Sequence, residues 1–370
     1  MNLTNRTLYI ADNLEVLRGI DSECVDLIYL DPPFNSKRKY EAAKKSIASG
    51  ASFKDVWDDD DVNSDWFDEV AKHNPHLYQL IQISESIYDK SMKSYLLMLS
   101  IRMIEMYRVL KSTGSIYLHC DPTASHYIKL IMDSIFGKQN FINEIVYKRT
   151  GSNNSSTNSF GRIHDTILFY IKGGKATWNS QYEAHDPKHI KNFYRHQDTH
   201  GQYGHATLIC YQSKGEAGQP WHNIDPAKSG SAWNAPRRGE YAKYIEENFI
   251  PNYRQITSVH KRLDALDKAG LIYWPKKGKI PRLKFYLDGS QGRVSQDIIT
   301  NIKIGSKHSE RIGYPTQKPL ALLELFIKSS SNKGDLVLDP FCGCATTCVA
   351  SELLDRQWVG IDISLSLIHI

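Results

Sequence analysis

The chain has 370 residues, of which 41% are hydrophobic and 24% are charged, as expected for a globular protein large enough for two domains. It has no apolar run of about 18 residues and no N-terminal signal pattern, which argues against a membrane helix and a secreted protein. Its six cysteines in so long a chain predict reduced thiols in a cytosol, not a disulfide framework.

The net charge of +5 is unevenly distributed along the chain. Residues 171–310 hold 22 Lys and Arg against 13 Asp and Glu, a balance of +9 that leaves −4 for the rest. A basic middle between slightly acidic ends indicates a polyanion-binding segment inserted in an enzyme core. An ordinary solvated basic surface is the alternative.

The first predicted strand covers residues 7–10 and ends at Ala11-Asp12-Asn13. A helix over residues 14–18 is predicted to follow, with Asp12 or Asn13 as its N-cap. Capping alone would explain Asp12. At the end of a strand, however, its carboxylate is also placed to hold a ligand amine.

A buried strand is predicted over residues 25–30, an apolar run that two prolines prevent from continuing. The next four residues, Asp31-Pro32-Pro33-Phe34, put a carboxylate at the carboxyl end of that strand, where open α/β sheets bind ligands. Asp31 and the Pro33 carbonyl are hydrogen-bond acceptors, and Phe34 offers a flat apolar face. This set suits a planar base with an exocyclic amino group; a Pro-Pro turn with a capping Asp is the structural alternative.

Residues 36–89 read as polar and irregular, and the acidic run 58–61 predicts a solvated loop. The elements predicted after this segment are a helix over 95–111, a strand over 115–119, a helix over 124–136 and strands over 141–148 and 166–171. This alternation of strands and helices predicts a doubly wound sheet. His119 and Cys120 lack a second ligand pair at metal-binding spacing, so no metal site is expected there.

The segment from residue 172 to about residue 311 loses this regular periodicity, and its aromatic residues interleave with basic ones. Basic clusters stand at 237–238, 261–262 and 276–279. Lys and Arg neutralise phosphates, and arginines or polar side chains can read the edges of a nucleic-acid groove. Any single ring in this segment could instead fill a small core.

The C-terminal part predicts a helix over residues 320–329, a strand over 334–339, a turn of small residues, a helix over 347–354 and a strand over 357–361. The last strand closes on Asp362. This order is half of a Rossmann-type nucleotide site, in which small residues admit the ligand and the final acid suits ribose hydroxyls. A GxGxxG motif is lacking, which disfavours a dinucleotide, and the spacing of the cysteines at 342, 344 and 348 matches no common zinc pair.

Taken together, DPPF at residues 31–34 and DPFCGCATT at residues 339–347 resemble the motifs of the β-class amino-group DNA methyltransferases. The resemblance implies an α/β fold: a Rossmann-like, doubly wound methyltransferase sheet, permuted so that the catalytic motif precedes the cofactor motif. It divides the chain into a catalytic part of the core (1–171), an inserted target-recognition region that binds DNA (172–311) and a cofactor-binding part of the same core (312–364). Residues 365–370 resemble the translation of a library adapter, so we expect a non-native tail there.

The resemblance also assigns roles to individual residues. The catalytic motif is Asp31, Pro32, Pro33 and Phe34. The residues expected to bind the cofactor S-adenosyl-L-methionine are Asp12, Thr316, Lys318, Asp339, Phe341, Gly343, Ala345, Thr346 and Asp362. Ala345 departs from the family, which usually has glycine at this position; if the backbone there needs a positive φ, alanine is strained and cofactor binding weakens.

The implied activity is methyl transfer to the exocyclic N6 of an adenine flipped out of duplex DNA. Adenine is preferred to cytosine N4 because, in this family, Asp at the first motif position goes more often with adenine and Ser with cytosine. The alternatives are a cytosine-N4 enzyme, an enzyme acting on RNA, and a catalytically impaired DNA-binding relative. A nicotinamide dehydrogenase is disfavoured by the DPPF turn.

The partner expected from the resemblance is double-stranded DNA, with no membrane and no metal. A restriction endonuclease and a second copy of the chain are partners that the sequence leaves open. The expected location is the cytoplasm of a prokaryotic or phage-like system.

Overall fold

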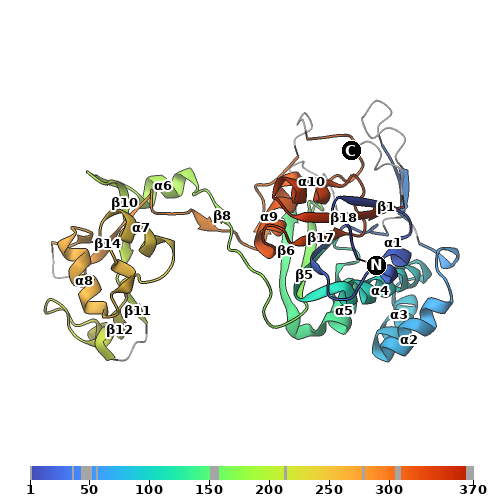
Figure 1. Cartoon of the computed structure of the whole chain (residues 1–370), viewed down its shortest axis with the longest axis horizontal. Coiled ribbons are helices and arrows are strands. Elements are labelled where there is room, and N and C mark those ends of the chain that lie inside the picture. Colours follow the sequence, from blue (N-terminus) through green and yellow to red (C-terminus); the bar gives the residue numbers. More distant parts are fainter. Residues whose placement is uncertain are drawn as a thin grey trace. The chain divides into compact units, whose positions relative to one another are not determined.

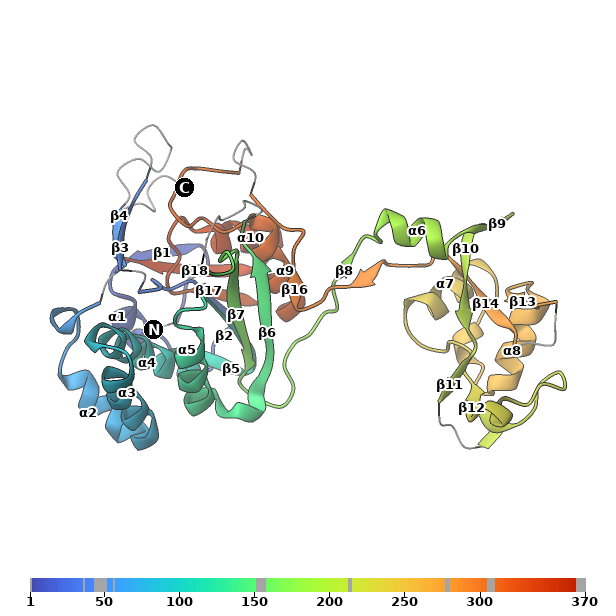
Figure 2. The same ribbon diagram turned by 180° about the vertical axis from the view of Figure 1, so that it is seen from behind.

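A computed structural model of the chain describes residues 2–35, 37–42, 52–55, 57–150, 158–211, 215–276, 280–304 and 310–363. The expected tail at 365–370 lies outside these described residues. The chain forms two compact units, which can be followed by colour in Figures 1 and 2. The first unit combines Met1–Gln181 with Gln296–Ile370, and the second is Tyr182–Ser295.

Within the described residues, eight strands of the first unit form one sheet in the order β1-β18-β17-β2-β5-β7-β6-β16. Their bounds are β1 Thr7–Ile10, β2 Val25–Leu30, β5 Leu110–Cys120, β6 Phe141–Lys148, β7 His164–Ile171, β16 Ile298–Ile299, β17 Leu336–Asp339 and β18 Gln357–Asp362. Seven of these strands run in one direction, and β7 runs antiparallel between β5 and β6. The N-terminal β1 pairs with the C-terminal β18. The predicted doubly wound, permuted α/β sheet is therefore confirmed.

Helices cover both faces of this sheet (Figure 1). Their bounds are α1 Asn13–Gly19, α2 Asp65–His73, α3 Pro75–Ile87, α4 Lys90–Val109, α5 Ser125–Met132, α9 Leu320–Ser330 and α10 Thr346–Leu353. Side chains of α1 to α5 share one buried cluster with the sheet, whereas α9 and α10 contribute to a second cluster. The sheet is buried on both sides, as is usual when the connections between parallel strands are helices.

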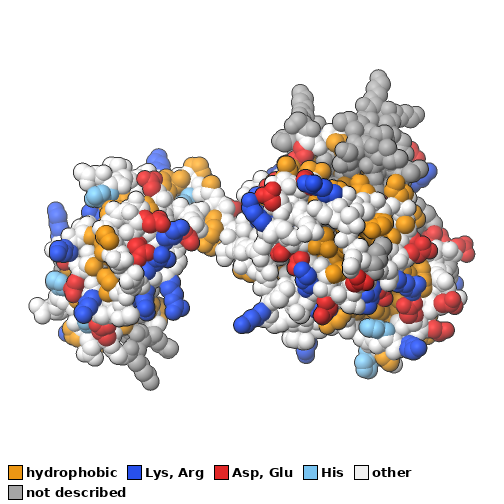
Figure 3. Space-filling model, viewed as in Figure 1, with side chains coloured by type: hydrophobic (Ala, Val, Ile, Leu, Met, Phe, Trp, Pro, Cys, Tyr) orange, Lys and Arg blue, Asp and Glu red, His pale blue; other side chains and the backbone are white. Residues whose placement is uncertain are grey.

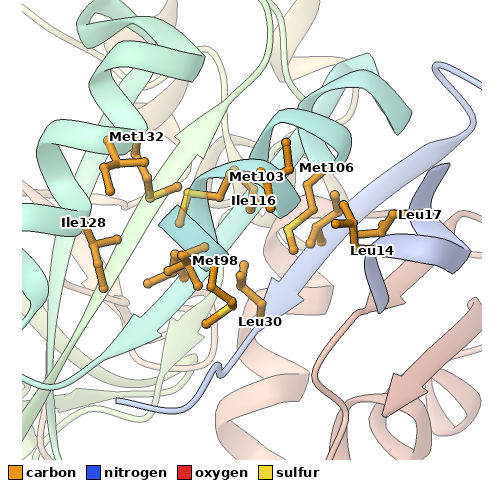
Figure 4. Close-up of a cluster of buried hydrophobic side chains, with 14 of the residues drawn as sticks. Leu14, Leu17, Leu30, Met98, Met103, Met106, Ile116, Ile128 and Met132 are labelled. Carbon is orange, nitrogen blue, oxygen red and sulfur yellow. The ribbon is translucent and has the colours of Figure 1, made fainter. Parts of the chain in front are cut away.

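The alternation of side chains along β2 shows how the two faces are filled. Ile28 and Leu30 belong to the cluster on the α1–α5 side, and Leu27 and Tyr29 to the cluster on the α9 side. Figure 4 shows the first cluster, in which Leu30 lies beside Met98 of α4. Because both faces are buried, β2 is apolar at every position except Asp26, which forms an ion pair with Lys111.

The prediction of an irregular segment over residues 36–89 was wrong. The structure has a hairpin of β3 (Arg38–Glu41) and β4 (Ser52–Asp55), then α2 and α3, which bury Val70 and Leu77 in the core. The start of α3 carries a readable signal: Asn74 accepts hydrogen bonds from the first backbone N–H groups, and Pro75 stands at the first helical position. Likewise, α4 begins five residues before the predicted start, because Asp89 caps it.

The second unit has its own core and its own strands: β8 Tyr182–Glu183, β9 His196–Asp198, β10 Gly201–Thr207, β11 Ile209–Tyr211, β12 Ser231–Trp233, β13 Ile272–Tyr273, β14 Arg282–Tyr286 and β15 Arg293–Val294. Its helices are α6 Pro187–Phe193, α7 Glu240–Asn248 and α8 Val259–Lys268. Trp221, Trp233, Tyr253 and Tyr286 are buried in that core, so these four rings are structural. Among the helices of the described residues, none has both the length and the apolar content needed to cross a membrane.

We expect Met106→Ala, on α4, to lower the free energy of unfolding by about 2–5 kcal/mol, because the side chain is fully buried and its loss leaves a cavity. Ile83→Ala, on α3, is the matched control. Ile83 is 56% exposed, so its loss should change the free energy of unfolding by less than about 1 kcal/mol. Urea unfolding of both variants measures the difference. Equal losses would contradict the core described for α4.

Candidate active site

Carboxylates stand at the carboxyl ends of four neighbouring parallel strands. In sheet order, Asp12 follows β1 by two residues, Asp362 ends β18, Asp339 ends β17 and Asp31 directly follows β2. Parallel strands end at the same edge of a sheet, so two segments far apart in sequence bring their acids to one place. This is the edge at which open α/β sheets bind ligands.

A cavity of about 510 Å³ opens at this edge. Its volume lies in the usual range of small-molecule sites. Of the thirteen residues that the sequence assigns to the site, twelve line it: Asp12, Asp31, Pro32, Pro33, Phe34, Thr316, Lys318, Asp339, Phe341, Gly343, Thr346 and Asp362. The structure thus brings the two motifs together in one cavity. Ala345 is the exception: its side chain lies against Cys342 and Cys348 in a small buried cluster.

The Asp31 carboxylate has two different oxygens. Oδ2 accepts a hydrogen bond from the Lys318 ammonium. Oδ1 is buried and has no hydrogen-bond partner among the described residues. Since burying an unpaired carboxylate oxygen costs free energy, Oδ1 is an acceptor ready for a ligand donor.

Lys318 was expected to bind the cofactor, and the structure places its ammonium group beside Asp31 of the DPPF motif. Besides Asp31, its Nζ donates to the Thr316 carbonyl at 3.3 Å and lies 5.3 Å from the centroid of the Phe34 ring. The side chain is 10% exposed. The ammonium therefore neutralises the charge of Asp31 at the floor of the cavity.

The turn after Phe34 is fixed by the neighbouring hairpin. The Asn35 backbone N–H donates to Asp55 Oδ1 at 2.7 Å, and the Lys37 N–H donates to the Asp55 carbonyl at 2.9 Å. Asn35 and Lys37 both have positive φ, near 56° and 58°. The DPPF motif is thus held from both sides, by β2 before it and by β4 after it.

The loop after β17 wraps around Asp362. The Gly343 N–H donates to Asp362 Oδ2 at 2.8 Å, and the Cys342 N–H donates to the Ile361 carbonyl at 3.0 Å. Gly343 has φ near 53°, a conformation that glycine adopts at little cost. A β-carbon at this position would approach the Tyr314 ring to 3.3 Å.

Asp339 is the most deeply buried of the four acids. Burial, together with the nearby charges of Asp31 and Asp362, raises the pKa of Asp339 to about 7. Its Oδ1 accepts a hydrogen bond from the Phe341 N–H at 3.1 Å. Near neutral pH a substantial fraction of this group keeps its proton, whereas an ordinary Asp has lost it.

Asp12 combines two functions. Its Oδ1 caps α1 by accepting the Leu14 N–H at 2.8 Å, and both of its oxygens accept hydrogen bonds from Arg102, at 2.8 and 2.9 Å. Arg102 is buried on α4, and burial lowers the pKa of its guanidinium from the ordinary value. The neighbouring Asn13 donates to the Pro340 carbonyl at 2.7 Å, which ties the loop after β1 to the loop after β17.

Sequence reasoning missed several residues of the cavity wall. Arg102 had a signal, because it is a charged residue among the apolar positions of a predicted amphipathic helix. Tyr29 and Tyr314 also line the cavity, and nothing in their local sequence marked them as site residues.

Ala345→Gly should stabilise the protein. Ala345 has φ near 54°, in the left-handed region, which costs a non-glycine residue about 1–2 kcal/mol. Allowing for the greater backbone entropy of glycine in the unfolded chain, we expect a gain of about 0.5–1 kcal/mol. Thermal unfolding measures it, with Gly343→Ala, in the same loop and at the same sign of φ, as the variant that should lose stability. A lower melting temperature for Ala345→Gly would contradict the strain.

The pKa of Asp339 predicts a pH-dependent difference between the unmodified chain and Asp339→Asn. Between about pH 4 and pH 7 the unfolded chain releases this proton and the folded chain holds it, so the contribution of Asp339 to stability falls as pH rises. Over that range the melting temperature of Asp339→Asn minus that of the unmodified chain should therefore increase. The limiting change is about 4 kcal/mol. Asp355→Asn, at an exposed site, is the control; a pH-independent difference for Asp339→Asn would contradict the raised pKa.

Comparisons with known proteins agree with this geometry. The chain is 30% identical to the type II methyltransferase M.EcaI of Enterobacter cloacae over 98% of its own length and 67% of that protein. It is 26% identical to the StyLTI Mod subunit, a type III restriction-modification enzyme of Salmonella typhimurium, over 96% of this chain and 51% of that one. It is 23% identical to the DNA adenine methyltransferase YhdJ of Escherichia coli, over 97% and 79% of the two chains. The chain thus spans about two thirds and one half of the first two relatives.

A solved DNA modification methylase of Thermus thermophilus aligns with 98% of the chain and 91% of its own, at 14% identity and a TM-score of 0.43. The family described as DNA methylase, whose model is named for N6 and N4 methyltransferases, matches residues 25–370. That match covers nearly the whole chain, including both motifs at the cavity. The chain belongs to this DNA methylase family.

Proposed function

We propose that the protein transfers a methyl group from S-adenosyl-L-methionine to the exocyclic N6 of an adenine flipped out of duplex DNA. The observation that carries the proposal is the buried Oδ1 of Asp31, which has no hydrogen-bond partner among the described residues and belongs to a side chain that lines the cavity shared with the loop after β17. One wall of this cavity suits an amine donor, and the other suits a ligand that needs close backbone approach.

The residues of the catalytic motif act on the amine. An exocyclic amine is a weak nucleophile, because its lone pair is delocalised into the ring. Asp31 and the Pro33 carbonyl would accept its two hydrogens, which steers the nitrogen towards tetrahedral geometry and frees the lone pair. Much of the rate should then come from positioning, worth up to about 7–11 kcal/mol in well-oriented reactions.

The base must leave the duplex before it can react. Flipping costs a few kcal/mol, and stacking against an aromatic ring in the pocket offsets part of this cost. Phe34 supplies that ring in our proposal. In the free protein its ring lies near the Lys318 ammonium, so we expect the lysine to yield space to the base.

The residues of the cavity also fit the proposed cofactor. Bound S-adenosyl-L-methionine supplies an electrophilic sulfonium methyl group. Asp362 lies at the end of β18, where an acid suits ribose hydroxyls, and Asp12 lies at the end of β1, where an acid can hold the adenine amine. The tight turn at Gly343 admits close approach of a ligand to the backbone. The cavity volume of about 510 Å³ is consistent with a ligand of this size.

We infer that the second unit binds the DNA. Residues 182–295 contain 18 Lys and Arg against 11 Asp and Glu, a net charge of +7. Figure 3 shows Lys and Arg side chains distributed over the visible face of this unit, with acidic residues between them. Such an excess supplies phosphate contacts and predicts salt-sensitive binding.

Biological context is part of the proposal. The relatives named above belong to bacteria, and one is a subunit of a restriction-modification enzyme. A restriction endonuclease partner, a homodimer and a cytoplasmic location are therefore proposals for this chain.

Adenine is proposed over cytosine because of Asp31 and because YhdJ is named as an adenine methyltransferase. Mass spectrometry of nucleosides from methylated DNA distinguishes the two bases.

Asp31→Ala should abolish methyl transfer to DNA, because it removes the acceptor for the amine, while cofactor affinity stays within a few-fold. Transfer of labelled methyl groups to unmethylated genomic DNA and equilibrium binding of the cofactor measure the two effects. Thermal unfolding is followed in parallel, since the variant leaves Lys318 without its partner. Asp355→Ala, which removes a surface carboxylate paired with Lys333, is the control and should keep full activity. Retained transfer by Asp31→Ala would refute its role.

A further inference from the structure

A row of polar side chains, buried except for Arg149 at its end, crosses the sheet behind the DPPF motif. Tyr29 on β2 donates from its hydroxyl to His119 Nδ1 on β5 at 2.9 Å, and His119 Nε2 lies 3.1 Å from Asp165 Oδ2 on β7. The other oxygen of Asp165 accepts a hydrogen bond from Arg149, directly after β6, at 2.9 Å. The order of these residues follows the order of neighbouring strands, β2-β5-β7-β6.

These hydrogen bonds fix the protonation of His119. Tyr29 is 2% exposed, His119 is fully buried and Asp165 is 1% exposed. Burial lowers the pKa of His119, so the ring is neutral. Burial alone would raise the pKa of Asp165, but the hydrogen bond from His119 and the nearby charges of Lys318 and Arg149 together outweigh it, and the pKa is lowered. The imidazole therefore carries its proton on Nε2, donates it to the Asp165 carboxylate and accepts the Tyr29 hydroxyl at Nδ1.

His119 supports both ends of the catalytic motif. Its partner Tyr29 stands two residues before Asp31 and therefore points to the same side of the sheet. On the other side of the motif, the Phe34 ring lies nearly parallel to the imidazole, at an interplanar angle of 19° and a centroid distance of 6.1 Å. A tautomer locked by Asp165 thus holds the imidazole in a fixed plane against Phe34.

His119 does not belong to the cavity wall, whereas Tyr29, Asp31 and Phe34 do. Both of its ring nitrogens are engaged, so it has no free group to offer a substrate. Any effect on the reaction must pass through its neighbours.

We propose that His119, oriented by Asp165, is a positioning residue for the methyl-transfer reaction. It holds the Phe34 ring in the orientation required for stacking with the flipped base. Through Tyr29, it also fixes the end of β2, after which Asp31 follows. This inference rests on the proposed function. It assigns a catalytic consequence to a histidine that would otherwise be only a satisfied buried side chain.

The chain offers a matched pair of variants. Tyr29 and Tyr117 are register partners on adjacent strands, and both are buried in the same cluster. Tyr29→Phe deletes the hydroxyl bound to His119, and Tyr117→Phe deletes a hydroxyl bound to Ser330 at 2.7 Å. Both lose one buried hydrogen bond, so their stabilities should fall similarly. Only the first breaks the link to His119.

The measurement is single-turnover methyl transfer to unmethylated genomic DNA at saturating cofactor and DNA. Its amplitude reports the fraction of folded, active protein, and its rate constant reports positioning. We expect Tyr29→Phe to lower the rate constant roughly 10- to 100-fold, in keeping with a small displacement of reacting groups, with the amplitude and the cofactor Kd nearly unchanged. Tyr117→Phe should stay within about threefold of the unmodified chain.

A double-mutant cycle with His119→Gln completes the test. Glutamine can replace Nε2 as a donor to Asp165, but it removes the ring and the nitrogen acceptor at the Nδ1 position that Tyr29 contacts. If Tyr29 acts through His119, adding Tyr29→Phe to His119→Gln should cause little further loss of rate. Equal rate losses in Tyr29→Phe and Tyr117→Phe, or losses of amplitude alone, overturn the positioning role. No methyl transfer by the unmodified chain would instead overturn the proposed function.

Discussion

The ion pair between Asp31 and Lys318 joins two segments that lie 287 residues apart in the sequence. Asp31 is the first residue after β2, and Lys318 lies two residues before α9, which packs on the face of the sheet that carries Leu27 and Tyr29. Neither charge is well solvated, so each depends on the other for compensation. The pair therefore makes the geometry of the catalytic motif depend on correct docking of the C-terminal part of the core. A cavity built from both ends of the chain exists only when that docking is complete.

Each of the four acids at this edge is stabilised in a different way. Asp31 is paired with a lysine, Asp12 with an arginine, and Asp362 accepts a backbone N–H, whereas Asp339 tends to retain its proton. Four ionised carboxylates at adjacent strand ends would repel one another. Because each carboxylate is paired, hydrogen-bonded or protonated, the repulsion between them is lowered. This arrangement also leaves Oδ1 of Asp31 buried and without a hydrogen-bond partner among the described residues, where the proposed reaction needs an acceptor.

Much of the sheet could be predicted because its strands are buried on both faces. The strand at 25–30 is apolar except at Asp26, and the acids at 31, 339 and 362 end or follow predicted strands, so their meeting at one edge follows from parallel pairing. The helices α2 and α3 escaped prediction, since in α2 only Val70 is fully buried and its remaining residues are mostly polar. The partners of Lys318 and His119 could not be predicted either. These partners depend on which strands become neighbours in the sheet and on how far a side chain reaches across them. Local periodicity of the sequence contains no information on either.

The second unit is inserted in the chain at a point where it does not interrupt the sheet of the first unit. The chain leaves the sheet after β7 and returns at β16, on the half of the sheet away from β1, β18 and β17. At the start and the end of the second unit, β8 and β15 pair antiparallel, so the two connections run side by side. Because the strands that bear Asp12, Asp362, Asp339 and Asp31 are contiguous, the insertion interrupts none of their pairings. The second unit can therefore change in sequence and size while the acidic edge, and the row from Tyr29 to Arg149 behind it, keep their geometry.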